Sequence, residues 1–146
     1  MRLSRIVLLL ALSLSSLALP MLAAAQSVTA GDITVHYSAI PTTTLTPDVA
    51  RQYGITRSAS RALINIAVRK GKLGSDVAVP SKVSATVTNL NGQRQSLVLR
   101  EVKEGDAVYY LGETRIDGHE TLSFEIEVTP TGRSEPIRAS FRQEFF

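Results

Sequence analysis

The sequence predicts an all-β fold: an antiparallel β-sandwich of about seven strands, of the immunoglobulin or fibronectin-III type, with one short helix. Polar and apolar residues alternate with a period of two through most of the chain after residue 32, which places successive side chains on opposite faces of a strand. Turns rich in Gly, Pro and Asn separate these runs at intervals of about 8 to 15 residues, as in sandwich folds. Only one segment carries the start and stop signals of a helix.

The first 25 residues have the three-part build of a secretory signal peptide. Arg2 and Arg5 precede an apolar stretch, and Pro20 is followed by the small residues Ala23 to Ala25. The stretch is shorter than the about 20 apolar residues that a membrane-spanning helix needs. We therefore expect cleavage after Ala25 and export to the periplasm. The remaining chain, residues 26–146, is expected to form one soluble domain without a membrane span.

The strands are expected where the alternation is clearest. They cover residues 33–38 (taken as the first strand), 61–70, 83–88, 96–102, 107–111, 122–129 and 136–145. The segment 61–70 reads as a central strand, with Ile64, Ile66 and Val68 on one face. The last two strands are expected to form a hairpin in which outward glutamates face outward arginines, each pair contributing a few tenths of a kcal/mol.

The helix is predicted near residues 47–53. Thr46 is a typical N-cap, Pro47 suits the first helical position, and Gly54 suits the position after the last turn. Two interpretations of this region remain open. Arg51, Arg57 and Arg61 with Tyr53 could form a binding cluster on a loop end. The favoured alternative is that the helix covers an open end of the sandwich with its apolar residues, Val49, Ala50, Tyr53 and Ile55.

Charge and composition argue against several functions. The first 25 residues hold two arginines and no acidic residue, which leaves 14 of the 16 Lys and Arg residues against all 13 Asp and Glu. This balance gives no clustered basic face for nucleic acid. Because Met1 and Met21 are the chain's two methionines and it has no cysteine, residues 26–146 offer no sulfur nucleophile and no soft metal ligand.

No catalytic residues, cofactor or metal site are expected from the motifs. The two histidines, His36 and His119, are too few for a typical mononuclear site, and the sequence leaves open whether they meet in space. The chain has no nucleophile elbow or phosphate-binding glycine motif. A non-enzymatic role is therefore expected.

Several segments together resemble a known family of small exported bacterial proteins, the domain of unknown function 4426. The resemblance is carried by residues 34–39 (TVHYSA), 45–58 (LTPDVARQYGITRS), 63–66 (LINI), 85–90 (ATVTNL) and 100–110 (REVKEGDAVYY). It implies a periplasmic β-sandwich and supplies no activity, cofactor or catalytic residue.

The leading functional hypothesis is a non-enzymatic periplasmic interaction module that binds a protein partner or envelope component through a sheet edge or the helix-capped loop end. The alternative is a small-molecule or metal-ion binding protein with a rim site near His36, Tyr53 and Arg57. The full set of candidate rim residues is His36, Tyr37, Tyr53, Arg57, Asn65 and Asp106.

Overall fold

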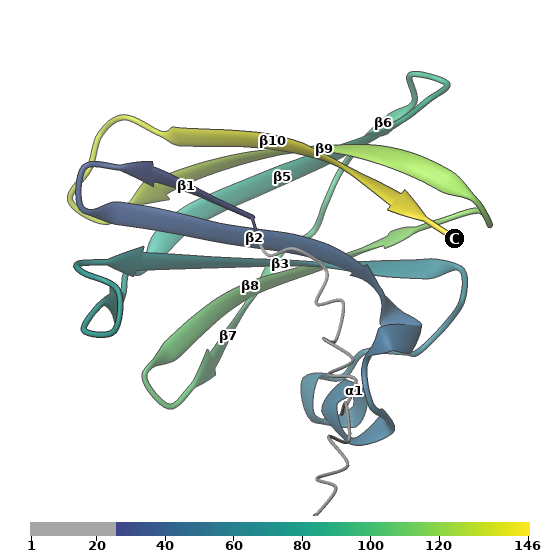
Figure 1. Ribbon diagram of the computed structural model, residues 1–146, viewed down its shortest axis with the longest axis horizontal. Helices are drawn as coiled ribbons and strands as arrows, with labels where there is room; N and C mark the ends of the chain where they lie inside the picture. The colour runs from purple at the N-terminus through teal and green to yellow at the C-terminus, as the bar shows by residue number, and fades with distance from the viewer. Residues whose placement is uncertain (1–25) are drawn as a thin grey trace, which may run out of the picture.

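Two antiparallel sheets packed face to face form the protein (Figure 1). The computed structural model describes residues 26–146, and the predicted signal peptide with its cleavage site lies outside them. Sheet A contains, in spatial order, β1 (Gln26–Ala30), β2 (Ile33–Pro41), β3 (Arg61–Lys70), β8 (Ala107–Arg115) and β7 (Arg100–Glu104), with β4 (Val77–Ala78) pairing the end of β3. Sheet B contains β10 (Ile137–Phe145), β9 (Glu120–Pro130), β5 (Ser81–Asn89) and β6 (Arg94–Ser96). A 3-10 turn, Thr42–Thr44, and helix α1, Pro47–Tyr53, follow β2. The prediction of an all-β sandwich with one short helix is confirmed.

The core lies between the sheets and is built from the inward residues of the alternating strands. Val35, Ile66 and Val128 are each fully buried. Phe141 of β10 stacks on Phe124 and is tilted against Tyr37, with ring centroids 4.9 Å apart in both pairs. Removing such a side chain from water stabilises the fold by about 1.5–3 kcal/mol, so this core can hold the two sheets together.

Most predicted strands are confirmed, and outward charged residues of β9 and β10 pair across the hairpin as predicted. Residues 61–70 form β3, which lies between β2 and β8. Strands β9 and β10 form the expected hairpin, in which Arg138 pairs with Glu127 at 3.1 Å across the outer face of sheet B.

Two strand predictions are wrong in detail. The strand at 33–38 is not the first, because β1 precedes it and pairs with it. The single strand expected over 96–102 is divided, since β6 belongs to sheet B and β7 to sheet A. Between them the chain crosses from one sheet to the other over Gly112. A Cβ at Gly112 would lie 2.6 Å from Leu99 Cδ2 and 3.1 Å from Ile64 Cγ2, so a glycine lets the crossing segment lie close to β8.

Helix α1 begins and ends as the sequence predicts. The Thr46 hydroxyl accepts a hydrogen bond from the Val49 amide at 3.3 Å, and Gly54 adopts a left-handed φ of 65° after the last turn. Its place differs from the favoured expectation. The helix lies against the outer face of sheet A (Figure 1), over a second apolar cluster of Ile55, Leu63 and Leu111 that is separate from the main core.

The helix occupies this place because the outer face of sheet A is not uniformly polar. Leu63 of β3 and Leu111 of β8 point away from the main core, and both are less than 8 % exposed. An apolar patch on a sheet face has to be covered by another element. The helix and Ile55 supply that cover, so α1 does not plug the open end of the sandwich.

Candidate functional site: a helix-covered groove on sheet A

The helix leaves a groove between itself and the outer face of sheet A. Its volume is about 270 Å³. The lining residues are Ser38 and Ile40 of β2, Leu63 and Asn65 of β3, Tyr109 and Leu111 of β8, and Leu45, Val49, Tyr53 and Ile55 from the helical segment. The surface is mainly apolar, and the side chains of Ser38, Asn65, Tyr53 and Tyr109 supply its polar groups.

Asn65 on the floor of this groove holds a polar atom without a partner. Its Oδ1 is buried, and it is the one buried side-chain oxygen or nitrogen in residues 26–146 that makes no hydrogen bond. The register places Ser38 on one side of Asn65 and Leu111 on the other. Since a buried unpaired acceptor costs about 1–3 kcal/mol, its retention on a central strand calls for an explanation.

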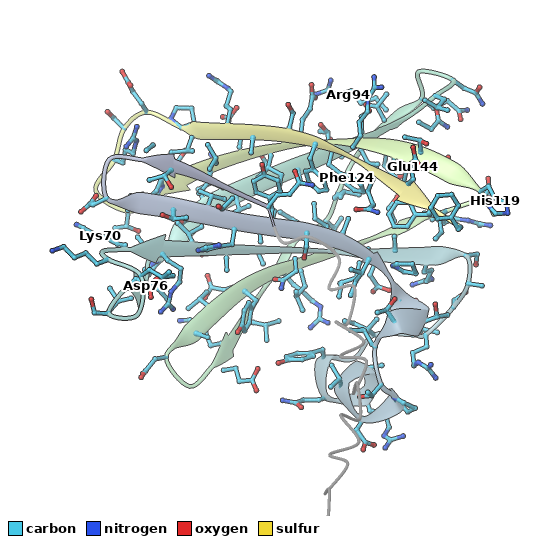
Figure 2. All side chains as sticks on the ribbon, in the orientation of Figure 1. Lys70, Asp76, Arg94, His119, Phe124 and Glu144 are labelled. Atoms are coloured by element: carbon cyan, nitrogen blue, oxygen red, sulfur yellow. The ribbon has the colours of Figure 1, made fainter. Side chains whose placement is uncertain are left out.

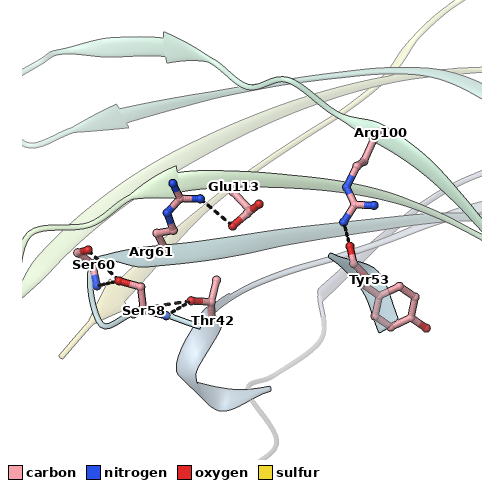
Figure 3. Close-up of polar contacts among 7 residues, drawn as sticks. All are labelled: Thr42, Tyr53, Ser58, Ser60, Arg61, Arg100 and Glu113. Carbon is pink, nitrogen blue, oxygen red and sulfur yellow. Dashed lines mark hydrogen bonds and ion pairs between the residues drawn. The ribbon is translucent and has the colours of Figure 1, made fainter. Parts of the chain in front are cut away.

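Two residues of β7 fasten the C-terminal turn of α1 over the groove. The Arg100 guanidinium donates a hydrogen bond to the Tyr53 carbonyl (Figure 3), and the Tyr53 hydroxyl donates to the Glu104 carboxylate. Gln52 Nε2 also donates to Glu104, at 3.3 Å. The hydrogen bond to Glu104, with a contribution from burial, raises the pKa of Tyr53 from its ordinary value of 10.0 to about 12.

The loop after α1 is fixed at its other side by Thr42. The Thr42 side chain is fully buried; its hydroxyl accepts from the Ser58 amide at 2.9 Å and donates to the Ser58 carbonyl at 3.1 Å (Figure 3). The wall of the groove is therefore held at both ends by hydrogen bonds.

A second hollow of about 350 Å³ lies further along the same face of sheet A. It is lined by His36, Ala67, Arg69, Asp76, Ala107, Val108 and Tyr109, so Tyr109 borders both hollows. The register sets Ala67 between His36 and Tyr109, and this small side chain leaves the depression. The hydrogen bond from Arg69, at 3.1 Å, lowers the pKa of Asp76.

The structure distributes the six candidate rim residues over several places. Tyr53 and Asn65 line the groove, and His36 lines the neighbouring hollow. Arg57 lines neither, since its guanidinium donates to the Thr43 carbonyl at 3.2 Å. Asp106 is exposed in the turn between β7 and β8.

The sixth candidate, Tyr37, does not belong to a binding rim, and its prediction is wrong. It is 8 % exposed and packs against Phe141 inside the sandwich. The physical reason is its place in the alternation, which puts it on the same inward face as Ile33 and Val35.

The two histidines do not meet. His36 lies in the hollow beside Asp76, whereas His119 packs edge-on against Phe146, with ring centroids 5.7 Å apart. Asp76 and His119 are at opposite ends of the sandwich (Figure 2). Within residues 26–146, no three His, Asp or Glu side chains lie close enough together to hold a metal ion, and no helix there is long and apolar enough to cross a membrane.

Sequence reasoning missed the residues that position the helix. Arg100 and Glu104 lie four residues apart on β7, a spacing that puts both side chains on one face of a strand. That regularity was visible, but their contact with α1 depends on β7 lying beside β8. Ser38 and Tyr109 were also missed, although both fall on the outward side of an alternating run.

The fold and the groove define an antiparallel β-sandwich protein with one helix-covered depression on its outer surface. The chain belongs to the family described as domain of unknown function (DUF4426), whose sequence model matches residues 27–146. The resemblance seen in the sequence is thereby confirmed.

One solved structure belongs to the same family, and two others share only the fold. A DUF4426 family protein from Pseudomonas aeruginosa PAO1 is 32% identical, with a TM-score of 0.69 over 84% of this chain and 94% of that one. FetP of the uropathogenic Escherichia coli strain F11, expressed in the periplasm of E. coli, shares the fold at 12% identity and a TM-score of 0.58, covering 84% and 93% of the two chains. A copper-bound single-substitution variant of FetP gives a TM-score of 0.57 at 12% identity, over 83% and 94% of the chains. No curated protein matches the sequence.

Proposed function

We propose that this chain is a non-enzymatic binding module of the bacterial periplasm, and that its groove receives an extended segment of a protein partner. The observation that carries the proposal is the unpaired Asn65 Oδ1 on the groove floor. Because this oxygen is buried, rotation of the Asn65 side-chain amide would bring it to the groove surface, where an N–H or O–H group of the partner would donate to it. An apolar side chain beside it would contact Leu63 and Leu111. Ligand sites commonly combine such an apolar lining with a few placed polar groups.

The two adjoining hollows along β3 favour an extended protein segment. The groove, of about 270 Å³, has room for one side chain and its neighbouring backbone. The second hollow continues in the same direction along β3. From Leu63 to Arg69 the outward face of β3 extends about 20 Å, at roughly 3.3 Å per residue. An extended segment could therefore place an apolar group in the groove and a polar group near Arg69.

The polar groups of the groove suit binding. Its lining contains hydroxyls and one amide, and no carboxylate, imidazole or amine, so the groove offers hydrogen bonds without a general base. The alternative rim site for a small molecule or metal ion gains no support, because His36 and Tyr53 line different hollows. The periplasmic location rests on the signal-like first 25 residues, and it agrees with the periplasmic expression of FetP.

Selection of short random peptides on the purified protein tests the proposal. Val49→Trp fills the groove from the helix side, and Ser84→Trp is a matched control on the exposed outer face of sheet B. We expect selected peptides to share an apolar residue next to a hydrogen-bond donor. Their affinity should fall about tenfold or more with Val49→Trp and stay unchanged with Ser84→Trp.

Two results would overturn the proposal. One is that Val49→Trp and wild type enrich the same peptides with equal affinity. The other is that a small molecule raises the melting temperature of wild type but not of Val49→Trp, which would assign the groove to a small ligand.

A further inference from the structure

β10 is an edge strand of sheet B, and its outer side is unpaired among residues 26–146. β10 is nine residues long and regular, since it pairs with β9 without interruption from Ile137 to Phe145. The other terminal strands are shorter: β1 and β7 have five residues and β6 has three.

Natural proteins often block such an edge with proline, a bulge or charged side chains, lysine above all, because exposed N–H and C=O groups pair readily with another strand. The sequence of β10, IRASFRQEF, contains neither proline nor lysine, and its charged residues Arg138, Arg142 and Glu144 have both signs and lie on the outer face. Its inward residues Ile137, Phe141 and Phe145 are buried. The strand therefore has a free backbone edge beside an apolar face.

We propose that β10 pairs antiparallel with β10 of a second copy of this chain, about a two-fold axis at Phe141. The two four-stranded sheets then become one continuous eight-stranded sheet. Only a register that pairs inward residues with inward residues keeps the apolar faces continuous. This register sets Ile137 opposite Phe145 of the second copy and Arg138 opposite its Glu144.

Charge selects this register over its neighbours. Because of the two-fold axis, the Arg138–Glu144 pair forms twice. A shift of two residues in one direction would set Arg142 opposite Arg142 of the second copy, and a shift in the other would set Arg138 opposite Arg142. Like charges directly opposite destabilise a strand pair, so both shifts are disfavoured.

The second copy would also give Glu144 and Phe146 partners across the axis. The Glu144 carboxylate has no ion-pair partner within residues 26–146 and lies on the outer face (Figure 2), whereas Arg138 already contacts Glu127. The dimer would extend this contact into a Glu127–Arg138–Glu144 row across three strands. The same register brings Phe146, which is 85 % exposed, opposite Pro136 of the second copy.

Sedimentation velocity over a concentration series tests the dimer, using protein purified after expression of the full chain. In a dimer of Glu144→Arg, an arginine at 144 faces Arg138 of the second copy in both cross-axis pairs. In a dimer of Arg138→Glu, a glutamate at 138 faces Glu144 in both. Each variant alone should dimerise about tenfold more weakly than wild type. Mixed in equal amounts, the two should form a heterodimer about as tight as the wild-type dimer, because each of its two cross-axis pairs sets an arginine of one variant opposite a glutamate of the other. Like charges face each other, in both pairs, only when a variant meets itself.

Lys72→Glu, in the exposed loop before β4, changes the net charge by the same amount as Arg138→Glu and should dimerise like wild type. Circular dichroism of each variant confirms that it is folded. The inference is wrong if wild type stays monomeric at every concentration, if Glu144→Arg dimerises as well as wild type, or if the mixture fails to restore the dimer. None of these results bears on the groove, which lies on sheet A.

Discussion

Replacing Asn65 by leucine should stabilise the protein, which is unusual for a substitution on a central strand. The change removes a buried acceptor that has no hydrogen-bond partner and adds apolar surface beside Leu63 and Leu111. An unsatisfied buried group costs about 1–3 kcal/mol, so we expect the free energy of unfolding to rise by about 1–2 kcal/mol. With a urea m-value of about 2 kcal/mol/M, the unfolding midpoint should rise by about 0.5–1 M.

Urea unfolding followed by circular dichroism measures this shift. Asn65→Asp is the matched control, because it keeps the shape of the side chain and puts a charge at the same buried position. It should lower the midpoint at neutral pH. A lower midpoint for Asn65→Leu would refute the reasoning, since it would mean that Asn65 contributes to stability. The expected pairing of higher stability with lost peptide binding would show that the asparagine is kept for function.

Three further predictions concern the scaffold of the groove. Because the pKa of Tyr53 is raised from 10.0 to about 12, the contribution of its phenol to stability is complete below pH 10 and is lost as the pH rises through 12. Tyr53→Phe should therefore remove this component of alkaline unfolding. Absorbance of tyrosinate, recorded for the variant and for wild type over the same pH range, measures the difference. Gly112→Ala should lower the free energy of unfolding by about 1–3 kcal/mol, since the new methyl group meets a leucine methyl carbon at 2.6 Å and an isoleucine methyl carbon at 3.1 Å; unchanged thermal unfolding would contradict it. Thr42→Val should cost about 1–3 kcal/mol in urea unfolding, because it leaves the buried contacts to Ser58 unmade, and an equal stability would mean that water replaces the hydroxyl.

Strands buried on one face were predictable from their period-two pattern. β9 alternates strictly between large apolar and polar residues, and β10 follows the same pattern with Ala139 and Gln143 as weaker inward positions. In β3 the alternation holds from Ile64 to Val68, while Leu63 adds an apolar residue on the outward face. β1 was missed because its five residues, QSVTA, carry a single large apolar side chain. The segment 96–102 was misjudged because its alternation continues while the chain changes sheets, and a local pattern does not record which ladder a residue joins.

The groove was predictable only in part. Tyr53 was predicted as part of the cluster around the helix, and Asn65 lay in a segment, residues 63–66, that carries the family resemblance. The error on Tyr37 came from including it with the family-like segment 34–39, although the alternation gives it an inward place. That α1 lies on sheet A, fastened by Arg100 and Glu104, follows from the neighbourhood of β7 and β8. The spacing of neighbouring residues does not predict which distant strands pair.

Photo-crosslinking in living cells tests the central claim, that the groove holds a protein partner, most directly. A photoreactive phenylalanine analogue at Val49 faces the groove, and the same analogue at Ser84 faces away from it on sheet B. The account predicts a discrete protein adduct from Val49 that disappears when Asn65→Leu is added, and no such adduct from Ser84. An adduct that survives Asn65→Leu, an identical adduct from both positions, or no adduct from Val49 would contradict it.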